Sequence, residues 1–155
     1  MFKILIATDG SNYAYRAADF AGSLAGHMPD AEFTVLSVLD LNLVAQTASI
    51  SPSGMPMTVP LNVTSDMEAA VNEMLQDTRE RLLATGRPVT ARLEFGDPAR
   101  VICDIADREH FDLIVMGPSG HGRVADILLG SVSDRVIHEA SVPVLIVRTK
   151  SSGTQ

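Results

Sequence analysis

The sequence predicts an α/β fold in which helices cover both faces of a parallel sheet. Short apolar runs typical of buried strands alternate along the chain with segments whose apolar residues recur at helical spacing. Such alternation indicates strand–helix–strand units, whose strands pair in parallel. The length of 155 residues corresponds to one domain with a full hydrophobic core. We therefore expect one five-stranded sheet.

The N-terminal part of the chain contains two expected strands and one helix. The first strand, FKILIA at residues 2–7, ends at the polar turn TDGS at residues 8–11. The serine or the aspartate of this turn can cap the next helix, whose apolar face runs through residues 14–25. A second strand, rich in Val, Leu and Phe, is expected at about residues 32–39.

Residues 40–65 show no period and contain three prolines, so we expect a long flexible loop. A loop of this length inside a compact domain is usually functional or disordered. Two interpretations stay open. The segment is a tolerated surface insertion, or its apolar Met and Val residues cover a pocket or line a subunit contact.

Helical spacing resumes at Met67 and continues to Leu82. A third strand at residues 89–95 alternates apolar and polar side chains, which favours a position at or near a sheet edge. Asp97 and Pro98 then form a typical helix start, with a capping residue followed by a proline in the first helical position.

The stretch from residue 111 to residue 147 carries the strongest functional signal. Two apolar runs, at residues 113–116 and 142–147, flank a glycine-rich loop and a helix that begins at residues 130–131, Gly-Ser. The first amide groups of a helix lack internal partners, and the helix dipole is positive there. Glycine allows the backbone to approach a phosphate closely. This pattern predicts an anion site between a strand and a helix.

The spacing of Gly117, Gly120 and the Gly130-Ser131 pair, with two and then nine residues between them, resembles the nucleotide-binding signature of the universal stress protein family, in its ATP-binding branch. The segments KILIATDGS, GDPARVICDIA and ASVPVLIV are also similar to that family. The resemblance covers a domain at residues 1–150 and leaves a polar tail at residues 151–155.

The resemblance implies a Rossmann-like fold of the adenine nucleotide alpha hydrolase type, with the parallel strand order 3-2-1-4-5. The alternating third strand suits an edge position in that order. Ligands of such sheets bind at the carboxyl ends of strands where the strand order reverses. The first and fourth strands are then neighbours, so Thr8 and Asp9 are expected beside Gly117 in one crevice.

The ligand that the resemblance implies is ATP, with Mg²⁺ on its phosphates. Asp9 is expected to accept hydrogen bonds from the ribose, Val38 to meet adenine through its backbone, and Met116 to lie under the nucleoside. The glycine-rich loop and the start of the last helix would hold the phosphates. The full set of predicted nucleotide-binding residues is Ala7, Thr8, Asp9, Val38, Met116, Gly117, Gly120, His121, Gly122, Arg123, Gly130, Ser131, Val132 and Ser133.

Structural interpretations of the same residues remain open. Asp9 is also typical of an Asp-Gly turn or a helix cap, and Val38 also suits a plain core position. His121 and Arg123 either touch a phosphate or belong to a solvated loop.

The last strand, at Val142–Val147, is almost wholly apolar although the expected strand order places it at an edge. An exposed apolar edge invites pairing with another chain. We therefore expect a partner subunit to cover it, and the resemblance implies a homodimer built on this edge.

Composition limits the classes of function. The net charge of −7 offers no basic face for a nucleic-acid backbone. No stretch approaches the roughly 20 apolar residues of a membrane span, and the N-terminus lacks the layout of a cleavable signal, which favours the cytoplasm. The single cysteine, Cys103, agrees with a reducing compartment.

The sequence shows no Walker-type phosphate loop and no Cys/His cluster with metal-ligand spacing. Such a chain is better suited to holding ATP than to hydrolysing it, so we predict no catalytic residues and a nucleotide-dependent sensor or regulator of the stress response. Three alternatives are a slow ATPase that uses Asp9 and a divalent metal, a structural dimer without nucleotide, and a fold similar to electron-transfer flavoproteins.

Overall fold

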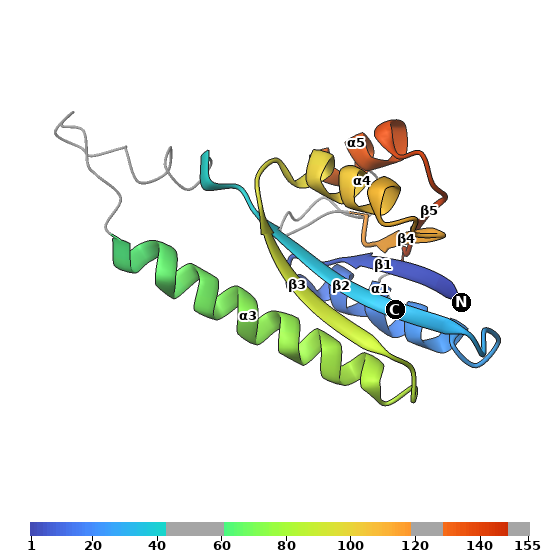
Figure 1. The fold of residues 1–155 in the computed structure, drawn as a ribbon. Helices are drawn as coiled ribbons and strands as arrows, with labels where there is room; N and C mark the ends of the chain where they lie inside the picture. The colour runs from blue at the N-terminus through green and yellow to red at the C-terminus, as the bar shows by residue number, and fades with distance from the viewer. Residues whose placement is uncertain (43–60, 119–128, 149–155) are drawn as a thin grey trace, which may run out of the picture.

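The computed structural model describes residues 1–42, 61–118 and 129–148, and the fold is a three-layer α/β sandwich (Figure 1). Five parallel strands form one sheet in the order β3-β2-β1-β4-β5. The strands are β1 (Phe2–Ala7), β2 (Ala31–Leu39), β3 (Val89–Phe95), β4 (Leu113–Met116) and β5 (Val144–Ile146). The helices between them are α1 (Asn12–Leu24), α3 (Leu61–Leu83), α4 (Pro98–Arg108) and α5 (Ser131–Glu139). The predicted fold class and strand order are confirmed.

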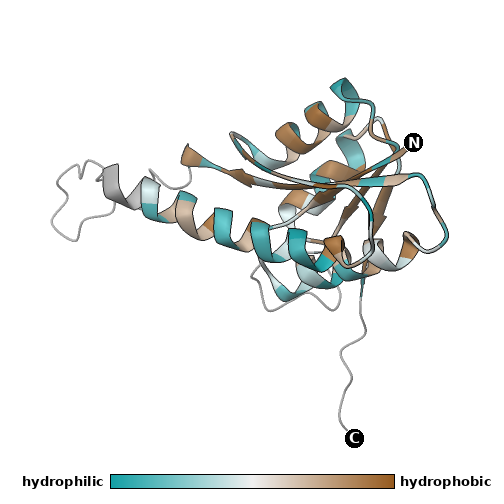
Figure 2. Ribbon diagram, turned by 60° about the horizontal axis from the view of Figure 1, so that its bottom comes forward, coloured by the Kyte–Doolittle hydropathy of each residue, from teal (hydrophilic) through white to brown (hydrophobic). Residues whose placement is uncertain are grey.

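Each face of the sheet has its own hydrophobic core. Ile4 and Ile6 of β1 pack with α1 and α3, whereas Leu5 and Ala7 pack with α4 and α5. Figure 1 shows the two pairs of helices on opposite faces. Successive side chains of a strand point to opposite faces, so a strand covered on both sides must be apolar throughout. Figure 2 shows the strands as largely hydrophobic, whereas α3 carries many hydrophilic residues.

Helix caps lie where the sequence places them. The Ser11 hydroxyl accepts a hydrogen bond from the Ala14 amide at 3.2 Å and caps α1. The Asp97 carboxylate accepts one from the Arg100 amide at 3.0 Å and caps α4, with Pro98 in the first helical position. A cap of this kind satisfies one of the four amides that a helix start leaves unpaired.

The two sheet edges agree with the prediction in position, although one strand is shorter than expected. Strand β3 lies at one edge and β5 at the other. Regular strand geometry in β5 covers Val144–Ile146 rather than the whole of Val142–Val147. Hydrogen bonding to β4 nevertheless extends further, because Ile114 donates to the Pro143 carbonyl and Val147 donates to the Met116 carbonyl.

Helix α3 begins at Leu61, so the loop predicted at residues 40–65 extends too far at its C-terminal end. Asn62, Thr64 and Ser65 are weak helix formers, and they obscure the period of this first part of the helix. Most of the predicted loop and the tail at residues 151–155 lie outside the described residues. No described helix combines the length and the apolar character needed to cross a membrane.

Candidate nucleotide site

A pocket of about 380 Å³ opens at the carboxyl ends of β1, β2 and β4. Strand β1 lies between β2 and β4, and the chain leaves β1 toward β2 before it crosses back to β4. This is the point where the strand order reverses, which is the usual ligand position in open α/β sheets. The volume lies within the range of roughly 300–1,000 Å³ that small-molecule sites occupy. The described lining residues are Ala7, Thr8, Asp9, Ala14, Leu36, Val38, Pro98, Ile102, Met116, Gly117, Gly130, Ser131, Val132 and Ser133.

Every predicted site residue that the structure describes lines this one pocket. These residues come from four separate parts of the chain: the end of β1, the end of β2, the end of β4 and the start of α5. Gly120, His121, Gly122 and Arg123 lie outside the described residues. The tertiary structure therefore brings together residues more than a hundred positions apart, as the expected strand order requires.

Four pocket residues were missed by the sequence reasoning: Ala14, Leu36, Pro98 and Ile102. Two of them had a usable signal. Leu36 lies two positions before Val38 in β2, so the two residues share one face of the strand. Pro98 directly follows the helix cap at Asp97, and α4 presents that end to the same edge of the sheet. Ala14 and Ile102 look like ordinary core positions of their helices.

One wall of the pocket is apolar. Leu36 and Ile102 are almost fully buried, and Val38 and Pro98 continue the same surface. This wall joins β2 to the first turn and a half of α4, on the sheet face that α4 and α5 cover. A planar aromatic ring fits such a surface because its burial removes apolar area from water on both sides.

The turn after β1 forms the floor beside this wall. An Asp9 carboxylate oxygen accepts a hydrogen bond from the Ser11 amide at 2.9 Å, and the Thr8 hydroxyl accepts one from the Gly10 amide at 3.3 Å. Gly10 has φ +75°, in the left-handed region that favours glycine. Asp9 is exposed and also lines the pocket. The turn interpretation of Asp9 and its position in the site are therefore compatible.

Helix α3 supports this turn from the opposite sheet face. The Thr8 hydroxyl lies 3.7 Å from the Met74 sulfur, and a Cβ atom added to Gly10 would lie 2.9 Å from Met74 Cγ. Met74 thus packs directly under the loop that carries Asp9. The backbone conformation and this close approach both favour glycine at position 10.

The start of α5 forms another wall of the pocket. Gly130 is the N-cap residue, and no side chain caps this helix. The Gly130 amide donates to the Pro118 carbonyl at 2.7 Å, and the buried Ser133 hydroxyl donates to the same oxygen at 2.5 Å. These two bonds tie the residues after β4 to the first turn of α5. The Ser133 hydroxyl therefore forms its hydrogen bond with the protein backbone.

The first turn of α5 is suited to an anion. The amides of Ser131 and Val132 are at helix positions that have no intrahelical partner, and both residues line the pocket. The positive end of the helix dipole lies at the same place. Asp9 is the only charged side chain among the described lining residues. Anion binding by this part of the site therefore depends on backbone amides and not on a lysine or arginine.

Gly117 has a packing role that the sequence did not show. A Cβ atom at this position would lie 2.9 Å from Tyr13 Cβ and 3.0 Å from the Tyr13 carbonyl carbon. The backbone after β4 therefore passes in direct contact with the first turn of α1. Only glycine allows that approach without a shift of one element.

Metal-binding side chains are sparse near this pocket. Across residues 1–42, 61–118 and 129–148, no three His, Cys, Asp or Glu side chains are grouped so that they would hold a metal ion. A metal ion in this part of the site would take most of its ligands from a bound anion and from water.

Comparison with known proteins agrees with this architecture. The model of the universal stress protein family matches residues 1–148. The universal stress protein Rv1636 of Mycobacterium tuberculosis is 35% identical over 148 residues, which are 94% of this chain and 95% of that protein.

Two solved structures extend the comparison. The structure of the hypothetical protein MJ0577 has a TM-score of 0.77 at 29% identity and covers 97% of this chain and 98% of its own. A universal stress protein in complex with cAMP has a TM-score of 0.67 at 25% identity, and the match covers 95% of this chain and 96% of that chain. A structural neighbour of this chain therefore binds a nucleotide.

Proposed function

This chain belongs to the universal stress protein family, and from that premise we propose that its pocket at the sheet switch point binds ATP. One observation carries the proposal. The pocket combines an apolar wall, which suits a base, with the uncapped start of α5, which suits phosphates. The complex of a structural neighbour with cAMP supports an adenine nucleotide as the ligand class.

The proposed arrangement follows from the two walls. Adenine lies against Leu36, Val38 and Ile102, which line the apolar wall. The ribose lies near Asp9, whose carboxylate accepts from hydroxyl groups. The phosphates lie at the amides of Ser131 and Val132 and along the backbone that follows β4.

The pocket is also compatible with Mg²⁺ on the phosphates. Magnesium usually keeps several waters and takes oxygen ligands from one or two carboxylates and from substrate phosphates. The described lining offers one carboxylate, Asp9, which suits this mode of binding. The ion would neutralise part of the phosphate charge in a site that has no cationic side chain among its described residues.

A charge introduced at the start of α5 tests the phosphate position. Ser131 is exposed and is the first residue of the helix, so Ser131→Glu keeps or improves helix stability while repelling phosphates. Saturating MgATP should stabilise the wild type by about 2.7 kcal/mol at a hundred times Kd, which raises Tm by about 5–11 °C for a domain of this size. Ser131→Glu should lose most of that shift, and the isosteric neutral control Ser131→Gln should keep it.

Outcomes of this experiment separate the alternatives. Equal shifts in both variants would place the phosphates elsewhere. Absence of any shift in the wild type at millimolar ATP would favour a dimer without nucleotide. Nucleotide released from the purified, heat-denatured protein identifies the bound species. Mostly ADP would support the slow ATPase, and turnover would then be measured for Asp9→Ala.

We further propose that the protein forms a homodimer through the β5 edge. Ile114 donates to Pro143, and Val147 donates to Met116, so alternate residues of this strand bond to β4. Val144 and Ile146 therefore turn their backbone N–H and C=O groups toward the open edge. An apolar strand with unpaired backbone groups is suited to pairing with a second copy of itself.

The dimer is tested by removing one outward donor. Ile146→Pro deletes an amide that faces the open edge and leaves the hydrogen bonds to β4 in place. We expect the wild type to sediment as a dimer and the variant as a monomer with an unchanged circular dichroism spectrum. A variant that remains dimeric at the same concentration would exclude this edge as the interface.

We propose that the protein is a sensor or regulator in the cytoplasm. Binding of ATP in the pocket would change the surface that the protein offers to a partner. Hydrogen exchange with and without MgATP checks this role. We expect protection to increase in α5 and in the turn after β1. Identical exchange in both states would remove the basis for a nucleotide-dependent switch.

A further inference from the structure

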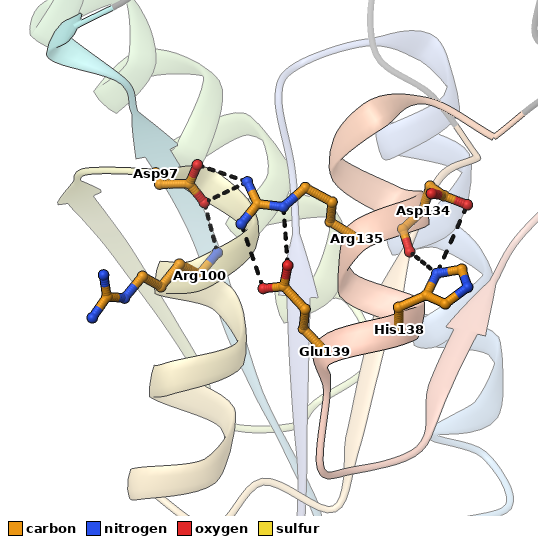
Figure 3. A network of polar contacts seen from close by, with 6 residues as sticks. All are labelled: Asp97, Arg100, Asp134, Arg135, His138 and Glu139. Carbon is orange, nitrogen blue, oxygen red and sulfur yellow. Dashed lines mark hydrogen bonds and ion pairs between the residues drawn. The ribbon is translucent and has the colours of Figure 1, made fainter.

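An ion pair joins α4 and α5, two helices whose residues line the pocket (Figure 3). Two hydrogen bonds run from an Arg135 guanidinium nitrogen on α5 to the carboxylate oxygens of Asp97, at 2.7 and 2.9 Å. Asp97 is the N-cap residue of α4 and directly precedes Pro98. Arg135 lies two residues after Ser133, the last residue of α5 that lines the pocket. The pair therefore connects both walls close to the site.

Other groups hold both partners in place. The Arg100 amide donates to Asp97 at 3.0 Å, so one carboxylate both caps α4 and receives the guanidinium. On the other side, Arg135 Nε donates to Glu139 at 3.0 Å along α5. Figure 3 shows the guanidinium between the two carboxylates. Arginine suits this position because its planar fork bonds several oxygens in a fixed orientation.

The pair lies outside the hydrophobic core that also joins these helices. Val136 and Ile102 are buried between α4, α5 and the sheet, whereas Asp97 and Arg135 have side chains about half exposed, at 45% each. The core contact packs both helices against the sheet. The ion pair acts at the rim, where the start of α4 faces the first turns of α5.

We propose that Asp97 and Arg135 are positioning residues of the nucleotide pocket, and that their ion pair sets the spacing between the apolar wall of α4 and the anion-binding start of α5. This inference rests on the proposed function. It predicts that a ligand touching both walls depends on the pair, whereas a ligand touching one wall does not. ATP is of the first kind and adenosine is of the second.

Three variants and one control test the inference by calorimetry. Asp97→Asn keeps a capping side chain and removes the charge, Arg135→Gln removes the cation, and the third variant combines both. The control is Arg92→Gln on β3. Arg92 pairs with Glu94 at 2.7 Å and Glu109 at 2.6 Å with similar exposure, and it is not a pocket residue.

The expected result is a rise in Kd for MgATP of about two- to fivefold in each single variant, the size that a half-exposed pair supports. The double variant should match the single variants, because the pair is lost in all three cases. Kd for adenosine should stay at the wild-type value. Arg92→Gln should leave both constants unchanged.

Three results would overturn the inference: wild-type Kd for MgATP in the variants, equal weakening of ATP and adenosine, or additive losses in the double variant. These results would leave ATP binding by the wild type intact, and so would not affect the proposed function. Failure of the wild type to bind MgATP would overturn the proposed function together with the role of the pair.

Discussion

A methyl group added at position 117 should destabilise the fold by a steric route alone. The new Cβ would lie 2.9 Å from Tyr13 Cβ, 3.0 Å from its carbonyl carbon and 3.1 Å from its carbonyl oxygen. Two of these three atoms are backbone, so a rotamer change does not relieve the contact. Gly117 is not among the residues with positive φ, so alanine there brings no conformational strain. Either α1 or the backbone after β4 must move.

The magnitude follows from what is known of overpacked positions. Inserting a methyl group that forces a backbone shift costs about 1–3 kcal/mol. Alanine also restricts the unfolded chain, and this stabilising effect offsets about 0.4–1 kcal/mol of the steric cost. Gly26→Ala is a matched control, because the nearest atom to its added Cβ lies at 3.8 Å and its φ is not positive. The unfolded-state term is common to both variants and cancels in their difference.

We therefore expect Gly117→Ala to be less stable than Gly26→Ala by about 1–3 kcal/mol in urea unfolding without nucleotide. For a domain of this size the difference in Tm is about 2–12 °C. Equal urea midpoints with equal slopes would refute the reasoning, because they would show that the contact with Tyr13 relaxes at no cost. The role of Gly117 would then lie only in the pocket.

Three further predictions concern single groups. Ser133→Ala removes a buried hydroxyl that donates to the Pro118 carbonyl, and urea unfolding should show a loss of about 0.5–1.5 kcal/mol. The pKa of Asp97 lies below its ordinary value of 3.8, first because Arg135 donates to it and then because a backbone amide does. Its stabilising effect is therefore complete above pH 3.8 and lost as pH falls through the lowered pKa, so unfolding of Asp97→Asn should depend less on pH in that range. Burial, followed by nearby carboxylates, raises the pKa of the Cys103 thiol, so reaction with a disulfide reagent at pH 8 should be slower than in the urea-unfolded protein and accelerate at higher pH.

Each of these has a contrary outcome. Wild-type stability of Ser133→Ala would show that the Gly130 amide alone secures the same carbonyl. Parallel acid limbs for Asp97→Asn and the wild type would mean that the carboxylate titrates normally in the folded protein. Equal thiol reactivity in folded and unfolded protein would mean that the Cys103 side chain is fully open to the reagent.

Periodicity was sufficient for most of the secondary structure. The run FKILIA is largely apolar, which is typical of a strand buried on both faces. The strand at residues 89–95 alternates apolar and polar residues, which is typical of a strand with one face in water. The start of α3 was wrong because Asn, Thr and Ser weaken the helical signal at residues 61–65. The regular part of β5 was shorter than predicted, and Pro143 lies just outside it.

The glycine-rich stretch and the polar turn after β1, together with the family resemblance that they carry, pointed to residues that line the pocket. Glycines, an aspartate and a Gly-Ser helix start are local features, and their chemistry can be inferred from neighbouring residues alone. What they did not show was the part of the apolar wall that α4 supplies. Ile102 has the pattern of any core residue, because a ligand surface and a core surface require the same side chains.

The sequence by itself determined the succession of strands and helices along the chain, the helix caps and the residue types at the start of α5, because these depend on contacts between near neighbours in the chain. The implied strand order already placed Thr8 and Asp9 beside Gly117, but only the tertiary structure decided which side chains of the helices meet the sheet, the turns and one another. The contact of Gly117 with Tyr13, the support of the first turn by Met74 and the pair between Asp97 and Arg135 all join segments far apart in sequence. Such contacts depend on how the helices pack on the sheet, and this packing cannot be inferred from a local sequence pattern.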